Sequence, residues 1–244
     1  MQQYFDYYYD GPPFELYGAG HLIFLALFGI ALWFLIWGWK NPTEVARERG
    51  RWLVLGVFLV VELSWHVWNI AHDAWTLQRH LPLHSCSIAA LGTIYVLITK
   101  SRRVYEIVFF LGIAGASQTL ITPEAGAYGL PHFRAIQTLL AHGMIILALV
   151  YMTTIMGLRP TWASIWKTML FGNLYLVFVT GVNYLLGSNY MYSMHKPETA
   201  SALDLMGPWP WYLVTAQFVA LFLFVLLYLP FALQDRQQKA LANP

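Results

Sequence analysis

Long apolar runs recur along the whole chain, and they constrain the fold more than any other feature. A helix needs about 20 apolar residues to cross the ~30 Å hydrocarbon layer of a membrane. Runs near that length lie at about residues 20–38, 134–156 and 210–232. Charged residues make up only 11% of the chain, whereas about a quarter of a soluble domain is charged. We therefore expect an all-α integral membrane protein.

Proline, glycine and charged residues divide the apolar sequence into seven predicted membrane-spanning helices. Their approximate bounds are 20–38, 53–72, 83–99, 104–121, 134–156, 163–186 and 210–232. The third and fourth are short and are joined by only a few residues. We expect one seven-helix domain over residues 20–232, between an extracytoplasmic N-terminal segment, 1–19, and a cytoplasmic tail, 233–244.

The basic residues predict the orientation of this polytopic fold. With seven spans, eleven of the fourteen lysines and arginines lie on one side of the membrane, and only Arg79, Arg134 and Lys196 lie on the other. Cytoplasmic loops carry an excess of Lys and Arg. We therefore expect the N-terminus outside and the C-terminus in the cytoplasm, and a multi-pass location in a bacterial plasma membrane.

The stretch LPLHSCSI, residues 81–88, contains Cys86, the only cysteine of the chain. Pro82 suits the first turn of a helix, which puts Cys86 about one turn inside the third span. The positive end of the helix dipole and the nearby imidazole of His84 favour the thiolate. Apolar surroundings disfavour the thiolate, and many cysteines outside disulfides are small buried apolar residues. Cys86 is therefore either a nucleophile or a small apolar residue that only packs against its neighbours.

Glu62, His66, Asn69 and Asp73 form a polar stripe in the second span. Their spacings of four, three and four residues put all of them on one helical face. Ionisable side chains inside a membrane are costly and mark candidate functional sites. The alternative is a seam of hydrogen bonds between neighbouring helices.

The fifth span opens with Arg134, Thr138 and His142 at intervals of four residues. His142 lies about ten residues from the outer end, so it is roughly 15 Å deep at ~1.5 Å per residue. It is a candidate base, or else a histidine with a purely structural hydrogen bond. Further polar side chains in the outer half of the bundle are Gln118, Asn183 and Asn189.

Six ordered motifs between about residues 15 and 232 form a set: LPLHSCSI, FFLGIAGASQTLITPE, GLPHFRAIQTLLAHG, RPTW, NYLLGSNYMYSMHKP and DLMGPWPWY. Together they resemble the YwaF-type integral membrane family, which has bacterial members without an assigned role and a related eukaryotic transmembrane branch. The resemblance implies a seven-helix fold. It also implies phospholipid acyltransferase chemistry, because that eukaryotic branch is understood to make polyunsaturated ether lipids through an acyl-cysteine intermediate. The matching position in this chain is Cys86.

The leading hypothesis is therefore a membrane-embedded lipid acyltransferase or transacylase. The thiolate of Cys86 would attack a phospholipid acyl ester, and His142 would act as the base. A lysophospholipid hydroxyl would then accept the acyl group, whereas water as acceptor would make the protein a lipid hydrolase. Other histidines that could serve as the base are His66 and His84. Supporting roles are predicted for Glu62, which would orient an imidazole, and for Gln118, Asn183 and Asn189 as oxyanion donors.

The alternative hypothesis is a transporter or binder without catalysis. The stripe from Glu62 to Asp73, together with Arg134, would then hold a small polar solute or a lipid in an outward-facing cavity. Phospholipids and lysophospholipids are the expected partners, and nucleic acid is not expected because no basic patch of the required kind is present. No metal or cofactor is expected, because no HExxH or multi-cysteine ligand spacing occurs. The sequence leaves the oligomeric state open.

Overall fold

The computed structural model describes residues 2–123, 126–197 and 201–242; residues 1, 124–125, 198–200 and 243–244, which include the outer ends of both predicted terminal segments, lie outside it. The described residues form seven α-helices and no strand. The helices are α1 (Ala19–Trp33), α2 (Glu44–Ala71), α3 (Ser85–Thr99), α4 (Arg102–Ile121), α5 (Phe133–Thr154), α6 (Trp162–Leu186) and α7 (Trp211–Ala242). A π-helical turn, η2 (Phe34–Gly38), continues α1, and 3-10 turns form η1 (Gln2–Tyr4), η3 (Tyr190–Tyr192) and η4 (Ala202–Met206).

In the part of the chain that the structure describes, six segments are long and apolar enough to cross a membrane: α1 with η2, α2, α4, α5, α6 and α7. The third predicted span, α3, is apolar but has only 15 residues. Helical structure throughout and repeated long apolar helices confirm a polytopic all-α membrane protein. Which end faces the cytoplasm stays a prediction.

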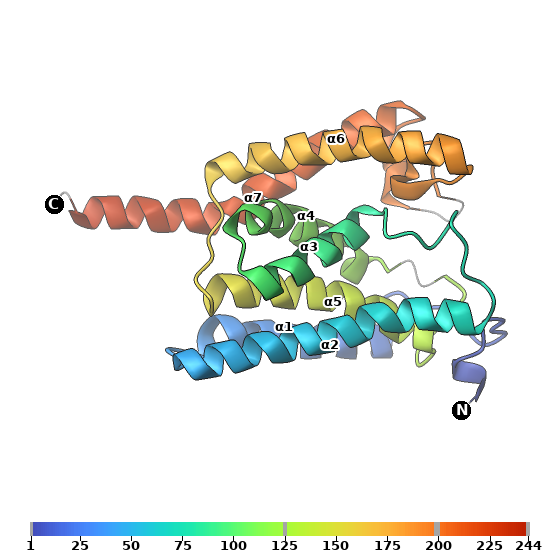
Figure 1. Cartoon of the computed structure of the whole chain (residues 1–244), viewed down its shortest axis with the longest axis horizontal. Helices are drawn as coiled ribbons and strands as arrows, with labels where there is room; N and C mark the ends of the chain where they lie inside the picture. Colours follow the sequence, from blue (N-terminus) through green and yellow to red (C-terminus); the bar gives the residue numbers. More distant parts are fainter. Residues whose placement is uncertain (1, 124–125, 198–200, 243–244) are drawn as a thin grey trace.

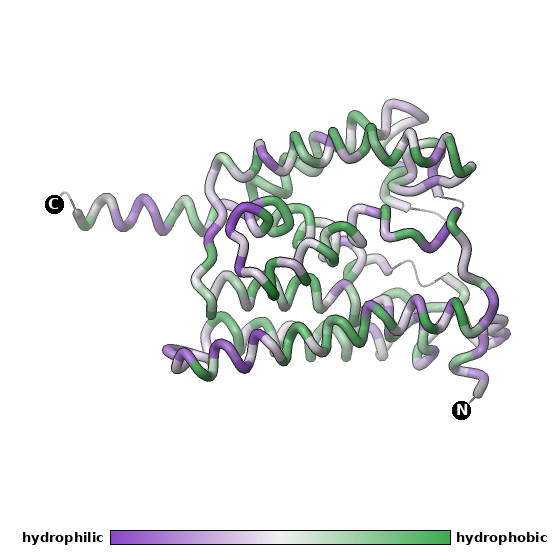
Figure 2. Tube along the Cα trace, in the orientation of Figure 1, coloured by the Kyte–Doolittle hydropathy of each residue, from purple (hydrophilic) through white to green (hydrophobic). Residues whose placement is uncertain are grey.

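Two helices extend beyond their predicted bounds because polar sequence continues them past the apolar part. The prediction began the second span at residue 53, but α2 begins at Glu44, and the Thr43 side chain caps it by accepting a hydrogen bond from Ala46 N at 3.2 Å. The last helix, predicted to end near residue 232, continues to Ala242. Figure 2 shows both extensions as hydrophilic helix ends beyond the apolar middle of the bundle.

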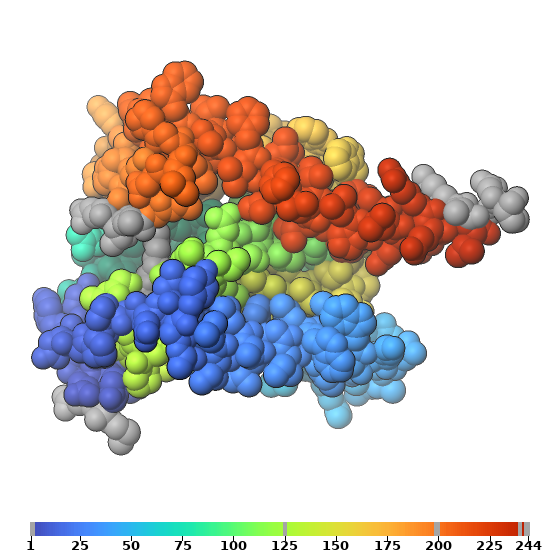
Figure 3. Space-filling model, turned by 180° about the vertical axis from the view of Figure 1, so that it is seen from behind, coloured from blue at the N-terminus to red at the C-terminus, as the bar shows by residue number. Residues whose placement is uncertain are grey.

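The helices α4 and α5 form the centre of the bundle. Over half of the apolar window of each is buried, 56% in α4 and 67% in α5, against 11% or less in α1, α6 and α7. In Figure 1, α1 and α2 lie along one side of these central helices and α6 and α7 along the other. From behind, α7 projects well past the other helices (Figure 3). The outer helices thus expose their apolar faces to lipid.

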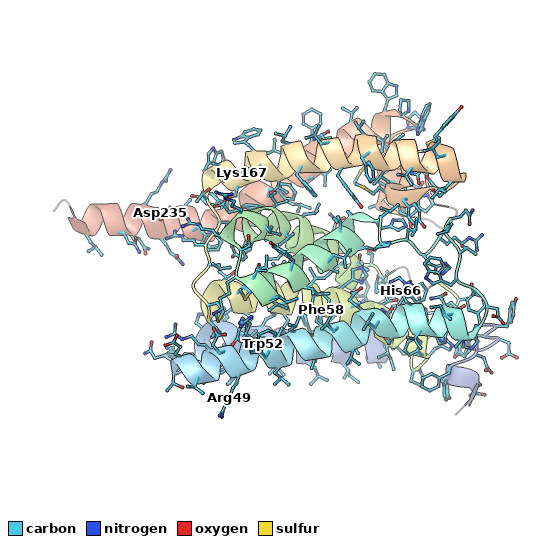
Figure 4. The ribbon with its side chains drawn as sticks, viewed as in Figure 1. Arg49, Trp52, Phe58, His66, Lys167 and Asp235 are labelled. Carbon is cyan, nitrogen blue, oxygen red and sulfur yellow. The ribbon has the colours of Figure 1, made fainter. Side chains whose placement is uncertain are left out.

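Ion pairs fix the helices at the end of the bundle that carries most of the basic residues. Lys167 of α6 pairs with the nearly buried Glu106 of α4, and Arg159 pairs with Asp235 of α7 at 2.7 Å. Figure 4 labels Lys167 and Asp235 at this end. The first contact holds α6 against the central helix α4, and the second holds α7 against the connection between α5 and α6.

Hydrogen bonds from the N-terminal segment close the opposite end of the bundle. Trp68 Nε1 donates to Phe5 O at 2.7 Å, and Tyr128 OH donates to Tyr7 O at 2.8 Å. The imidazole of His132, which caps α5, contacts Asp6 O at 3.0 Å. The segment therefore lies across the ends of α2 and α5 rather than extending into solvent.

Candidate functional site

Cys86 lies in the first turn of α3 and packs against Gly115 of α4. A Cβ atom added to Gly115 would lie 3.4 Å from Cys86 Sγ. The cysteine is half-buried at the edge of the apolar core. The missing side chain at position 115 brings the thiol close to the backbone of the central helix α4.

His142 of α5 lies at the same level of the bundle. One turn further in, Gly112 lies between Ala89 of α3 and Ile145 of α5: an added Cβ would be 3.6 Å from Ala89 Cβ and 2.9 Å from Ile145 Cγ2. Neighbouring turns of a helix face follow at intervals of three or four residues. A step of three residues toward the outer end therefore leads from Ala89 to Cys86, from Gly112 to Gly115, and from Ile145 to His142. This spacing puts the thiol and the imidazole at a similar level on the neighbouring helices α3 and α5.

One hydrogen bond determines the tautomer of His142. Its Nδ1 lies 2.8 Å from the backbone oxygen of Thr138. A carbonyl oxygen only accepts, so Nδ1 must carry the proton and donate it. The remaining nitrogen, Nε2, then has a lone pair. In this form the imidazole can accept a proton from a thiol or a hydroxyl.

The two other candidate bases carry the opposite tautomer. Nδ1 of His84 accepts from Met191 N at 3.3 Å, and Nδ1 of His66 accepts from Trp75 Nε1 at 3.2 Å. Both partners are N–H groups that only donate, so the ring proton of each neutral imidazole is on Nε2. His84 and His66 can therefore donate a hydrogen bond through Nε2 but have no lone pair left as a base. Among the three, His142 alone is suited to that role.

The predicted orienting role of Glu62 does not match the hydrogen bonds. The carboxylate makes no hydrogen bond or ion pair within the described ranges, and the carbonyl of Thr138 orients the His142 ring instead. The reason is local, because a histidine side chain four residues along a helix reaches the free lone pair of that carbonyl. Glu62 lies half-buried beside Val61, whose carbonyl is 3.5 Å from Gln137 Nε2 of α5.

Two of the predicted oxyanion donors are already engaged in the α6–α7 connection. The buried Asn183 donates from Nδ2 to Tyr190 O and Ser193 Oγ, at 2.8 and 3.0 Å, and accepts from Ser188 Oγ. Asn189 donates to His195 O at 2.8 Å. These amides shape the turn after α6. An oxyanion would have to displace one of these bonds.

Gln118 remains available as a donor. It follows Gly115 by three residues on α4, and its side chain is exposed without a hydrogen-bond partner in the described part of the chain. It therefore lies one turn outside Cys86 on the neighbouring helix, where its amide could reach an oxygen bound near the thiol.

Arg134 belongs to a second polar cluster at the outer ends of α2 and α5. Its guanidinium lies 3.9 Å from the ring centroid of Trp65, and Nη1 donates to Gln137 Oε1 at 2.8 Å. The buried His80 packs against Trp65 and Trp75, and this burial lowers its pKa. Figure 4 shows His66 on the inner side of α2 near this end. Arg134, Gln137, Trp65 and His80 thus form one cluster at the outer ends of α2 and α5.

Comparison with protein families adds to this geometry. A model of the TMEM164 family matches residues 16–228. The chain belongs to the TMEM164 family. Membership of this transmembrane family and the repeated apolar helices both indicate an integral, multi-pass membrane protein. No curated protein and no solved structure shows significant similarity to the chain.

Tyrosines that hold the start of α3 were not among the predicted site residues of this TMEM164-family chain. Tyr190 OH donates to Leu77 O at 2.7 Å and accepts from Leu81 N at 2.9 Å. Tyr175 of α6 donates to Leu83 O at 3.2 Å. Their signal in the sequence is weak, because tyrosines are common wherever a helix leaves a membrane.

Proposed function

We propose that this TMEM164-family protein transfers acyl groups between membrane lipids through a thioester on Cys86. The observation that carries the proposal is the arrangement around Gly115. A thiol and an imidazole with a lone pair on Nε2 lie at one level on neighbouring helices. A nucleophile activated by an adjacent base is the usual basis of covalent acyl transfer.

The reaction has two balanced halves. In the first, His142 Nε2 takes the thiol proton, Cys86 Sγ bonds to the ester carbonyl carbon, and the ester C–O bond breaks. The lysophospholipid alkoxide that leaves takes the proton from His142. In the second half, a hydroxyl of another lysophospholipid gives its proton to His142 and attacks the thioester. The C–S bond breaks, and the thiol recovers its proton.

The other polar groups fit supporting roles. Thr138 O holds His142 in the tautomer that accepts a proton, and it stabilises the imidazolium that forms. Gln118 is suited to donate to the developing oxyanion, which typically lowers the barrier by about 3 kcal/mol. Cys86 and His142 lie on helices of the apolar bundle, so acyl esters of membrane lipids are the proposed substrates.

The proposal is tested on protein reconstituted in vesicles that contain a phospholipid with an alkyne-tagged acyl chain. The parent protein should acquire a tagged acyl group that hydroxylamine releases, as expected for a thioester. Cys86→Ala should abolish this labelling, and His142→Gln should slow it by about 100-fold or more. Ser87→Ala, next to the thiol, is the matched control and should label like the parent. Labelling of Cys86→Ala at the parental rate would contradict the proposal.

A second candidate function, solute or lipid binding without catalysis, is favoured by one observation. Asn69 Oδ1 is buried with no hydrogen-bond partner among the described residues. On the same face of α2, the carboxylate of Glu62 is also unpaired in that part of the chain. Two such acceptors suit a ligand with N–H or O–H donors. Lipid composition of membranes with and without the protein separates the two functions, since only acyl transfer changes the acyl-chain distribution in a Cys86-dependent way.

A further inference from the structure

A polar cavity of about 340 Å³ lies at the end of the bundle opposite Cys86. It opens where η2 ends, α2 begins and α5 ends. Its polar lining comes from Lys40, Asn41, Arg47 and Thr154, and its apolar wall includes Leu35 and Trp39. The cavity therefore combines two cations with an apolar side.

Neither cation of the cavity is neutralised by an acid among the residues that the structure describes. Within the described ranges, Lys40 and Arg47 take part in no ion pair. Both residues are exposed and therefore accessible to a ligand. Of the two acids nearest to Arg47 along α2, Glu48 pairs with Arg51 and Lys100, both at 2.6 Å, and Glu44 forms no ion pair with Arg47 within the described residues. Two unpaired cations beside one cavity attract an anion.

The walls of the cavity are held in place by hydrogen bonds and ring packing. Tyr151 OH of α5 donates to Arg47 O at 2.5 Å, and the Tyr151 ring packs edge-on against Trp39 at 5.9 Å. Trp39 N donates to Phe34 O at 2.8 Å and so closes the π-helical turn. π-Helical turns are rare and occur often at functional sites. This turn displaces Trp39 and Lys40 from the path of a regular α-helix.

The cavity lies where the chain leaves the membrane. The apolar spans Ala19–Gly38 and Phe133–Thr154 both end at its rim. Trp39 lines it, and tryptophan is enriched at the membrane–water interface. A ligand that fills both halves of this cavity needs an anionic group beside an apolar body.

We propose that this cavity binds the phosphate of an anionic phospholipid headgroup. Lys40 and Arg47 contact the phosphate oxygens, and Leu35 and Trp39 contact the glycerol and the first methylenes below it. Arginine matches phosphate geometry through paired N–H donors. The site is distinct from that of the proposed acyl transfer, and neither depends on the other.

The test measures lipid binding to the purified, full-length protein by native mass spectrometry and by thermal melting. The probes are phosphatidylglycerol, phosphatidylcholine and inorganic phosphate. Phosphatidylglycerol should bind and raise the melting temperature, and phosphatidylcholine should do so far less. The double variant Lys40→Gln/Arg47→Gln should weaken phosphatidylglycerol binding by about 10- to 30-fold, since each basic residue near anionic lipid contributes about 1 kcal/mol.

The control is Arg49→Gln/Arg103→Gln, which removes the same total charge from the same end of the bundle. Arg49 lies on α2 and points away from the other helices (Figure 4). This control should change the affinity by less than about twofold, and both double variants should melt like the parent before lipid is added. Equal weakening by the two variants would overturn the proposal, because it would indicate unspecific attraction. Competition by inorganic phosphate as strong as that by the lipid would overturn the lipid assignment.

Discussion

His84, at the start of α3, and His142 of α5 carry their ring protons on different nitrogens. Met191 N–H fixes one tautomer and Thr138 C=O fixes the other. A neutral imidazole has a single lone pair, so a base must keep it unoccupied. The backbone group opposite Nδ1 therefore decides which histidine can accept a proton.

Substitution of His84 tests this assignment. In His84→Asn, the side-chain oxygen can still accept from Met191 N, and asparagine is a good residue at the helix N-cap that His84 occupies. We expect the rate of thioester formation to stay within about threefold of the parent, because His84 is not the base. The rate is measured by hydroxylamine-sensitive acyl labelling. A loss as large as that from His142→Gln would assign the base to His84 instead.

His132 makes the stability of the N-terminal closure depend on pH. It is fully buried and neutral: Nδ1 accepts from Arg134 N at 3.1 Å, and Nε2 donates to Asp6 O. Burial lowers its pKa below the usual 6.5, although hydrogen bonding to Asp6 O and the charge of Asp6 oppose this shift. Protonation therefore favours the unfolded chain. The contribution of His132 is full above about pH 6.5 and is lost as the pH falls through its lowered pKa.

We expect the melting temperature of the parent to fall between pH 7.5 and pH 5. In His132→Asn, which keeps a cap acceptor for Arg134 N but does not titrate, this fall should be smaller. His80 also has a lowered pKa, but it is present in both proteins and cancels in the comparison. Melting curves in detergent over this pH range provide the measurement. Identical pH profiles would show that His132 does not titrate with unfolding.

At the scale of elements, the position of Cys86 depends on a contact between two connections. The turn η3 after α6 presents Tyr190 to the connection between α2 and α3, where its hydroxyl bonds to Leu77 O and Leu81 N. Asn183 holds this turn from within α6. The start of α3 is therefore positioned by a segment about a hundred residues away in sequence.

Tyr190→Phe should loosen the start of α3. The change removes the hydroxyl that bonds to the partly buried Leu81 N–H and to Leu77 O, and loss of one hydrogen bond typically costs about 1 kcal/mol. We expect faster hydrogen exchange over residues 77–88 and slower acyl labelling of Cys86, with α4 and α5 unaffected. Tyr184→Phe, at a tyrosine that is 80% exposed on α6, is the matched control. Unchanged exchange over residues 77–88 would argue against this positioning role.

At the scale of the whole molecule, the basic residues predict that the N-terminus and the Cys86 end face outward. The sole cysteine makes this testable, since Cys86→Ser yields a protein without thiols. In that background, Asp10→Cys should react with a membrane-impermeant maleimide on intact cells. Arg103→Cys should react only after the membrane is opened. The reverse pattern would invert the topology.

The helical fold was predictable, because the length of the apolar runs and the proline, glycine and charged residues between them suffice to place the spans. The start of α2 was not, since residues 44–51 are polar and belong to the helix only through the Thr43 cap and contacts such as the one between Arg51 and Leu97 O. At the site, helix-face spacing predicted that Thr138 and His142 share a face. It could not assign tautomers, because the partners of His84 and His66 come from Met191 and Trp75 in connections outside the helices.

The shortness of α3 has a consequence for the surrounding bilayer. Its 15 residues span about 22 Å at ~1.5 Å each, several ångströms less than an average hydrocarbon layer. A bilayer becomes thinner around a short hydrophobic segment. The leaflet beside Cys86 should therefore be locally thinner, which moves the glycerol esters of its lipids closer to the thiol. Acyl transfer at this thiol would then respond to membrane thickness: short-chain bilayers would present their esters readily, and thick, sterol-rich ones would hold them out of reach.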